Sequence, residues 1–151
     1  MNRKVLFILF CILFLSGQIA YAMGLSTTFG QVRVDNVKIG QTYSMTKDVD
    51  TPFVIKNTSD IELALKIDVL VPKENELIEG YEAIPDANWI KLEKDYFPLP
   101  PQSEVSTDIL INIPDKERYK GKKYQVYIWS HTIEGTIGIG LRSKLLITIG
   151  E

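Results

Sequence analysis

The chain has 151 residues, and its 17 Lys and Arg against 19 Asp and Glu give a formal net charge of −2. This balance supplies neither the basic footprint of a nucleic-acid-binding protein nor a basic patch for anionic lipid. The sequence holds one cysteine, Cys11, and one histidine, His131. It therefore excludes a disulfide framework and a zinc site built from Cys and His.

The first 22 residues are typical of a secretory signal peptide. Arg3 and Lys4 precede an apolar run over residues 5–15, and Ala20-Tyr21-Ala22 matches the small-residue cleavage pattern. The run is too short to span a bilayer. We expect residues 1–22 to be cleaved and residues 23–151 to form one domain that is secreted to the periplasm or the exterior, without stable membrane insertion. An uncleaved anchor is the alternative.

The rest of the chain predicts strands separated by turn residues. Alternating patterns recur in residues 29–37, 38–45, 51–57, 61–72, 103–113, 122–133 and 138–149. Residues 89–101 give a short strand and a proline-rich extended piece, which prolines restrict to a sheet edge or to a crossing between sheets. About seven strands without helical periodicity indicate an all-β, immunoglobulin-like antiparallel β-sandwich.

The stretch "PPQSEVSTDILINIPDKERYKGKKYQVYI" resembles a pattern of bacterial envelope sandwich domains, in which a proline-rich turn precedes a strand closed by "IP". "VKIGQTYSM" and "PFVIKNTSD" resemble their early strands. The chain is similar to WxL-interacting and galactosidase-associated sandwich domains, and distantly to the first domain of pilus chaperones. This resemblance covers most of residues 30–149 and implies an envelope or secreted module. It transfers no site residues, because the matching residues are turn and core positions, and the chaperones' basic anchoring pair has no match here.

Catalytic chemistry finds little support in the sequence. Ser130 and His131 are neighbours on a predicted strand, so their side chains point to opposite faces and cannot act together. The acidic stretch from Glu74 to Asp86 offers carboxylates for calcium, but their spacing is loose and a solvated loop is the simpler interpretation. We therefore expect no enzyme activity, no cofactor and no metal site, and the calcium question stays open.

The most informative feature is a stripe of rings on alternate positions of one strand: Tyr127, Trp129 and His131. With Val126 and Ile128 in the core, the stripe and Gln125 face outward, beside Arg142 and Lys144 of the last strand. Three interpretations compete. The rings are shielded by long cationic side chains, they anchor a protein partner, or they stack on sugars.

Another interpretation concerns the final strand, residues 139–149. At a sheet edge it could donate or accept a strand, unless Arg142 and Lys144 protect it from such pairing. The sequence thus predicts a non-catalytic secreted module for protein–protein interaction, adhesion or scaffolding in a bacterial envelope. Its partner would be an envelope or extracellular protein. The alternatives are binding of cell-wall polysaccharide through the rings, and chaperone-like strand exchange.

Overall fold

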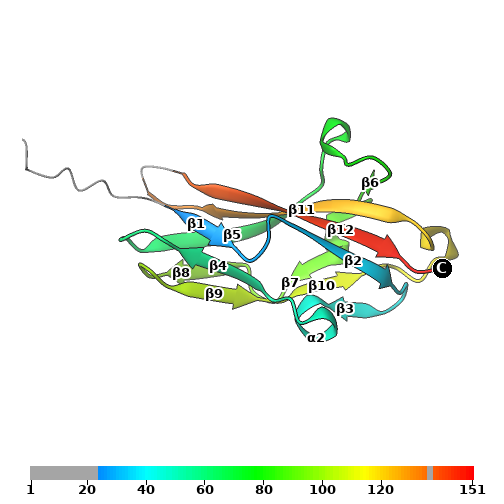
Figure 1. Cartoon of the computed structure of the whole chain (residues 1–151), viewed down its shortest axis with the longest axis horizontal. Coiled ribbons are helices and arrows are strands. Elements are labelled where there is room, and N and C mark those ends of the chain that lie inside the picture. Colours follow the sequence, from blue (N-terminus) through cyan, green and yellow to red (C-terminus); the bar gives the residue numbers. More distant parts are fainter. Residues whose placement is uncertain (1–23, 136–137) are drawn as a thin grey trace, which may run out of the picture.

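The computed structural model describes residues 24–135 and 138–151, and Figure 1 shows them as an elongated sandwich of two β-layers. The expected signal peptide, residues 1–22, lies outside the described residues. One layer is a six-stranded sheet in the order β2-β12-β11-β5-β8, with β6 beside β11. The other layer consists of two three-stranded sheets, β1-β4-β9 and β3-β10-β7. Over the part of the chain described, no helix has the length and apolar character needed to cross a membrane.

The bounds of the elements follow the chain order. The six-stranded sheet contains Gln31–Val37 (β2), Leu63–Leu70 (β5), Glu82–Ala83 (β6), Tyr96–Leu99 (β8), Lys123–Thr132 (β11) and Gly140–Ile149 (β12). The other layer contains Leu25–Thr27 (β1), Thr42–Ser44 (β3), Phe53–Asn57 (β4), Ile90–Leu92 (β7), Glu104–Thr107 (β9) and Ile109–Asn112 (β10). The helical segments are Met45–Val49 (α2), Glu74–Glu76 (η1), Ala87–Trp89 (η2) and Glu117–Tyr119 (η3).

The predicted all-β, immunoglobulin-like sandwich is confirmed. The last two predicted strands form a hairpin, in which β11 pairs antiparallel with β12 from Lys123↔Thr148 to His131↔Gly140. The pairing is not antiparallel throughout, since β2 runs parallel to β12 and β6 runs parallel to β11. Several predicted strands are also divided, because the chain leaves one sheet and continues in another.

The core lies between the layers, and the alternation of each strand determines which residues enter it. In β5, Leu63, Leu65 and Ile67 are buried, as the pattern of residues 61–72 predicted. The ends of that pattern behave differently, since Ile61 is 44% exposed and Val71 is 47% exposed. The inward face of the strand is therefore shielded from solvent only where the second layer covers it.

The proline-rich segment crosses between the layers, which confirms the expectation for residues 89–101. Its first part, β7, pairs with β10, and its second part, β8, pairs with β5. The first strand crosses similarly, since β1 pairs with β4 whereas β2 pairs with β12. The turn that follows β4 holds this end of the sandwich together. The buried Asn57 amide donates to the carbonyls of Ile61, Leu99 and Pro100 at 2.7, 3.0 and 3.0 Å.

The sequence analysis missed the short helix α2, which interrupts the path from β3 to β4. Ser44 caps it by accepting a hydrogen bond from the Lys47 N–H. Asp108, between β9 and β10, accepts hydrogen bonds from the Ser44 hydroxyl and the Thr46 N–H. Burial of Asp108 opposes its ionisation, but these hydrogen bonds outweigh burial and hold its pKa below the ordinary value. One carboxylate thus joins the helix to the sheet.

Candidate binding face

The outer face of the six-stranded sheet carries all five residues that the sequence singled out for binding. Tyr127, Trp129 and His131 of β11 are half-buried there, opposite the buried face of the same strand. The register places Tyr127 beside Lys144 and Trp129 beside Arg142 of β12. We call these five residues the ring face. The structure brings them together as expected, while their role in binding stays a prediction.

One end of the ring face is covered by the acidic loop, residues 74–86, which Figure 1 shows rising from the six-stranded sheet and returning at β6. The buried Gln125 amide donates to the Glu76 carbonyl at 2.9 Å and accepts from the Ile78 N–H at 2.9 Å. The prediction that Gln125 faces outward is correct for its direction, but Gln125 is not part of an open surface. Its side chain does point outward, but the acidic loop folds over it and leaves it fully buried.

The same loop reaches the middle of the ring face through Glu76. The Glu76 carboxylate accepts from Arg142 Nη1 at 3.0 Å, and its backbone carbonyl lies 3.5 Å from the Tyr127 hydroxyl. The Arg142 guanidinium lies 5.7 Å from the centre of the Tyr127 ring. The hydrogen bond from the Lys73 N–H, aided by Arg142, holds the pKa of Glu76 below its ordinary value. Arg142 thus shields Tyr127 and also anchors the loop.

The other end of the ring face is held by side chains from β5. His131 Nε2 lies 2.7 Å from Asp68 Oδ2, and the rings of Trp129 and His131 stack with centroids 3.9 Å apart. Gly140 makes room for this pair, because a Cβ there would lie 2.8 Å from Trp129 Nε1. Trp129 therefore has one ring face against His131, while the hydrogen bonds of Glu76 reach Tyr127 and Arg142.

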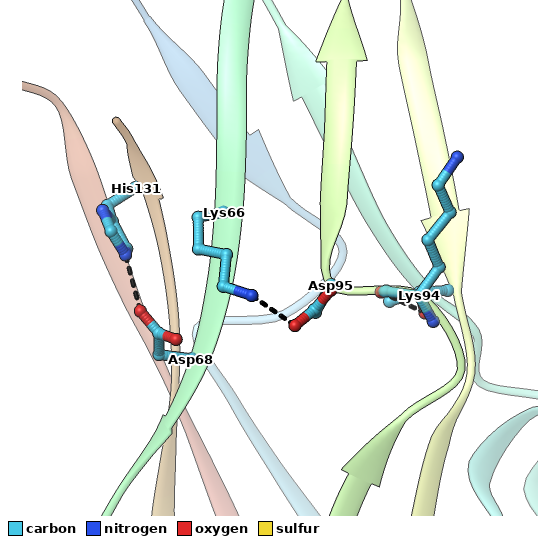
Figure 2. A network of polar contacts seen from close by, with 6 residues as sticks. Lys66, Asp68, Lys94, Asp95 and His131 are labelled. Atoms are coloured by element: carbon cyan, nitrogen blue, oxygen red, sulfur yellow. Dashed lines mark hydrogen bonds and ion pairs between the residues drawn. The ribbon is translucent and has the colours of Figure 1, made fainter. Parts of the chain in front are cut away.

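An ion pair lies beside this contact between His131 and Asp68. Figure 2 shows His131 directed at Asp68 and, across β5, Lys66 directed at Asp95. The hydrogen bond between Lys66 and Asp95 raises the pKa of the lysine and lowers the pKa of the aspartate. Both pairs are exposed enough for solvent to screen them, so their effect is mainly to orient side chains. Ser130, in contrast, is buried on the core side, away from His131.

The carboxylates proposed for calcium point to different partners. Glu76 pairs with Arg142, Glu82 pairs with Lys122 at 2.7 Å, and Asp86 accepts from the Asn88 N–H at 2.8 Å. Throughout residues 24–135 and 138–151, no group of three His, Cys, Asp or Glu side chains is placed to hold a metal ion. The acidic loop instead covers one end of the ring face, where Gln125 and Arg142 hold it.

The idea that the final strand lies at an edge is wrong. β12 pairs with β11 on one side and, from Lys144 to Ile149, with β2 on the other, so it is an interior strand of the sheet. Lys144 lies in the part of β12 that β2 covers, so it protects no open edge. Sequence reasoning also missed Glu76 and Gln125 as partners, because 49 positions separate them and no local pattern reports such a contact.

Comparisons with known proteins support the fold alone. No protein-family model matches the sequence, and no curated protein matches it significantly. Among solved structures, the chain is similar to PapD-like domain 7 of human CEP192, with 12% identity and a TM-score of 0.61. That match covers 90% of this chain and 96% of the CEP192 domain. The fold is therefore a PapD-like, immunoglobulin-like β-sandwich.

Two further structures have the same fold. The periplasmic chaperone SfaE has 12% identity and a TM-score of 0.56, over 85% of this chain and 59% of SfaE. A candidate carbohydrate-binding protein from Bacteroides ovatus has 9% identity and a TM-score of 0.60, over 84% of this chain and 37% of the other. A family 123 glycoside hydrolase of Clostridium perfringens also contains the fold, in 27% of its chain.

Proposed function

We propose that this chain is a non-catalytic binding module of a bacterial envelope or of the exterior, and that it holds a protein partner on the ring face. The observation that carries the proposal is the arrangement of Trp129. Its ring is positioned by His131 and Gly140, it remains half-buried, and the hydrogen bonds of the acidic loop go to Tyr127 and Arg142 beside it. Tyr, Trp and Arg are the side chains that most often dominate the binding energy of protein interfaces.

Separate observations support the proposed location in the envelope or the exterior. The opening sequence is typical of a secretory signal peptide, and SfaE, one of the structural neighbours, is a periplasmic chaperone. The absence of cysteine beyond Cys11 means that the domain depends on packing, which we associate with bacterial secretion more than with animal secretion.

The test compares capture of partners from the native envelope fraction by three forms of the protein. These are the unchanged chain, a Trp129→Ala/Lys144→Ala variant, and a control variant, Arg33→Ala/Asp35→Ala, which alters the outer face of β2. All three must show the same melting temperature. We expect a protein that binds the unchanged and control forms but not the ring-face variant. Equal capture by all three forms contradicts the proposal.

Carbohydrate binding on the same face is the second candidate. It is favoured by the partly open Trp129 ring beside Asp68 and Arg142, and by the neighbour from Bacteroides ovatus. In a Trp89→Phe variant, Trp129 is the only tryptophan of the domain. A saturable change of its fluorescence with cell-wall polysaccharide is expected if sugars stack there. An unchanged spectrum at saturating polysaccharide eliminates this candidate.

A further inference from the structure

β5 of the six-stranded sheet has a strand partner along only half of one side. β8 pairs with β5 from Leu63↔Leu99 to Lys66↔Tyr96, and the Ile67 N–H then donates to the Asp95 carbonyl at 2.8 Å. At that point the chain preceding β8 crosses to the other layer, where β7 pairs with β10. β5 continues to Leu70 with β11 on its other side alone. Its last residues therefore form an internal free edge.

The alternation of the strand identifies which backbone groups are unpaired. The Ile67 N–H points toward the β8 side, so the N–H of Val69 and that of Val71 point the same way. Within the described residues, neither N–H donates a hydrogen bond to any backbone or side-chain group. The edge also lacks ordinary protection. Its one charged side chain, Asp68, is held by His131, and Val71 is 47% exposed.

The free edge lines one wall of a groove of about 340 Å³. Ile67, Asp68 and Val69 form that wall. The opposite wall comes from η2, β7 and the start of β8, with these lining residues: Ala87, Asn88, Ile90, Lys91, Leu92 and Asp95. The groove exists because the crossing segment takes β7 away from β5. It thus places unpaired peptide groups beside the apolar side chains of Val69, Ile90 and Leu92 and among polar ones, which suits a strand of alternating character.

We propose that this groove binds an extended peptide segment of a partner protein, which adds as a strand to the free edge of β5. Residues of the peptide that face inward would contact Val69 and Leu92, so they are apolar. Residues that face outward would lie beside Asp68, so they are polar. Asp68 and Asp95 line the groove beside Lys91, but Asp95 is paired with Lys66 and Asp68 with His131. With both carboxylates engaged, the outward positions of the peptide need only be polar.

The proposal does not depend on the ring face. The groove lies at the edge of β5, whereas Trp129 and Lys144 lie on the outer face of β11 and β12. A Trp129→Ala variant should therefore keep its affinity for the peptide. The failure of one proposal would leave the other standing, because each has its own variant and its own measurement.

The probe is a short synthetic peptide that alternates valine and threonine between terminal lysines, tested by fluorescence anisotropy with the whole domain. Two derivatives carry backbone N-methyl groups, one on the valines and the other on the threonines. In a bound strand, alternate N–H groups point to opposite sides. We expect one derivative to bind about tenfold more weakly or worse, and the other to bind like the parent peptide. Equal affinities of the two derivatives overturn the proposal.

The protein side of the test uses Val69. A Val69→Pro variant removes the unpaired N–H without removing a bond to β11, because that N–H points away from β11. A Val69→Thr variant is the matched control that keeps the N–H. We expect loss of peptide binding in the first variant and unchanged binding in the second.

Hydrogen exchange gives a readout that does not require any variant to fold. The Val69 amide should exchange rapidly in the free domain and slowly with peptide bound. Slow exchange in the free domain contradicts the open edge. A concentration-dependent dimer of the free domain that Val69→Pro abolishes would also contradict the proposal, since a second copy would then be the occupant.

Discussion

At the scale of single residues, Asp108 connects segments that are distant in the sequence. Its carboxylate accepts hydrogen bonds from Ser44 and Thr46 at the start of α2, and its own carbonyl accepts from the Glu93 N–H. It thereby joins β3, α2 and the crossing segment at one point. The carboxylate is effective because it is ionised, and the hydrogen bonds that it accepts favour that ionised form.

Asp108→Asn should therefore lower the free energy of unfolding at pH 7 by about 1.5–3 kcal/mol, the usual contribution of hydrogen bonds to a charged group. Because the folded state lowers the pKa of Asp108, its contribution is complete above the ordinary value of 3.8 and is lost as pH falls through the lower folded pKa. The difference between the unchanged protein and the variant should thus shrink below that pH. Urea unfolding between pH 2.5 and 7 measures it.

The control for this prediction is Asp35→Asn on the exposed side of β2, which removes an equal charge without these hydrogen bonds. It should cost little at any pH. A difference for Asp108→Asn that stays constant down to the lowest pH would show that the charge of Asp108 is not what matters.

At the scale of elements, the acidic loop is held by one buried amide and one exposed ion pair. The Gln125 amide satisfies a carbonyl and an N–H of the loop away from water, whereas the Arg142–Glu76 pair is open to solvent. Buried polar groups that lose their partner cost more than exposed pairs do. The amide should therefore matter most for the position of the loop.

Gln125→Ala should lower the free energy of unfolding by about 1–3 kcal/mol, since it leaves the Glu76 carbonyl and the Ile78 N–H without a partner. Arg142→Ala should change it by less than about 1 kcal/mol. Hydrogen exchange of the Ile78 amide should accelerate in the first variant and not in the second. If both variants behave alike, the ion pair contributes as much as the amide.

At the scale of the whole molecule, the chain crosses repeatedly between the layers, and two of these crossings are only three residues long. β1 and β2 lie in different layers although three residues separate them, and β7 and β8 do the same in the middle of the chain. Separation of the two layers would therefore break the pairing of strands at each of these crossings. Trp89 lies in the core and packs edge-on against Tyr119 and Tyr124, whereas Trp129 lies on the outer face. The two tryptophans thus report on different places.

Unfolding should be two-state, with one midpoint for both tryptophans. The measurement uses Trp89→Phe and Trp129→Phe variants, each with one remaining tryptophan, and compares fluorescence with far-ultraviolet circular dichroism in urea. Within each variant the two signals should coincide. A fluorescence midpoint of Trp129 that precedes the circular dichroism midpoint would mean that the outer face unfolds separately.

The sequence by itself determined the local features of this protein. Alternation gave the inward residues of β4, β5, β10 and β11, because side chains on a strand point to opposite faces whatever the strand pairs with. Prolines predicted the crossing of residues 89–101, because they cannot donate a ladder hydrogen bond. The ring face was predicted for the same local reason, since Tyr127, Trp129 and His131 share one parity.

Only the tertiary structure decided what covers each face and which edge is open. Gln125 has the same parity as Trp129, yet the acidic loop buries it through contacts across 49 positions. The sequence left open whether the final strand lies at a sheet edge, and β2 covers it from Lys144 onward through a parallel pairing that no local pattern predicts. The open edge lies instead on β5, because the chain crosses to the other layer beside Ile67. Pairing and coverage are decided by segments far away in the sequence, so periodicity within one strand carries no information about them.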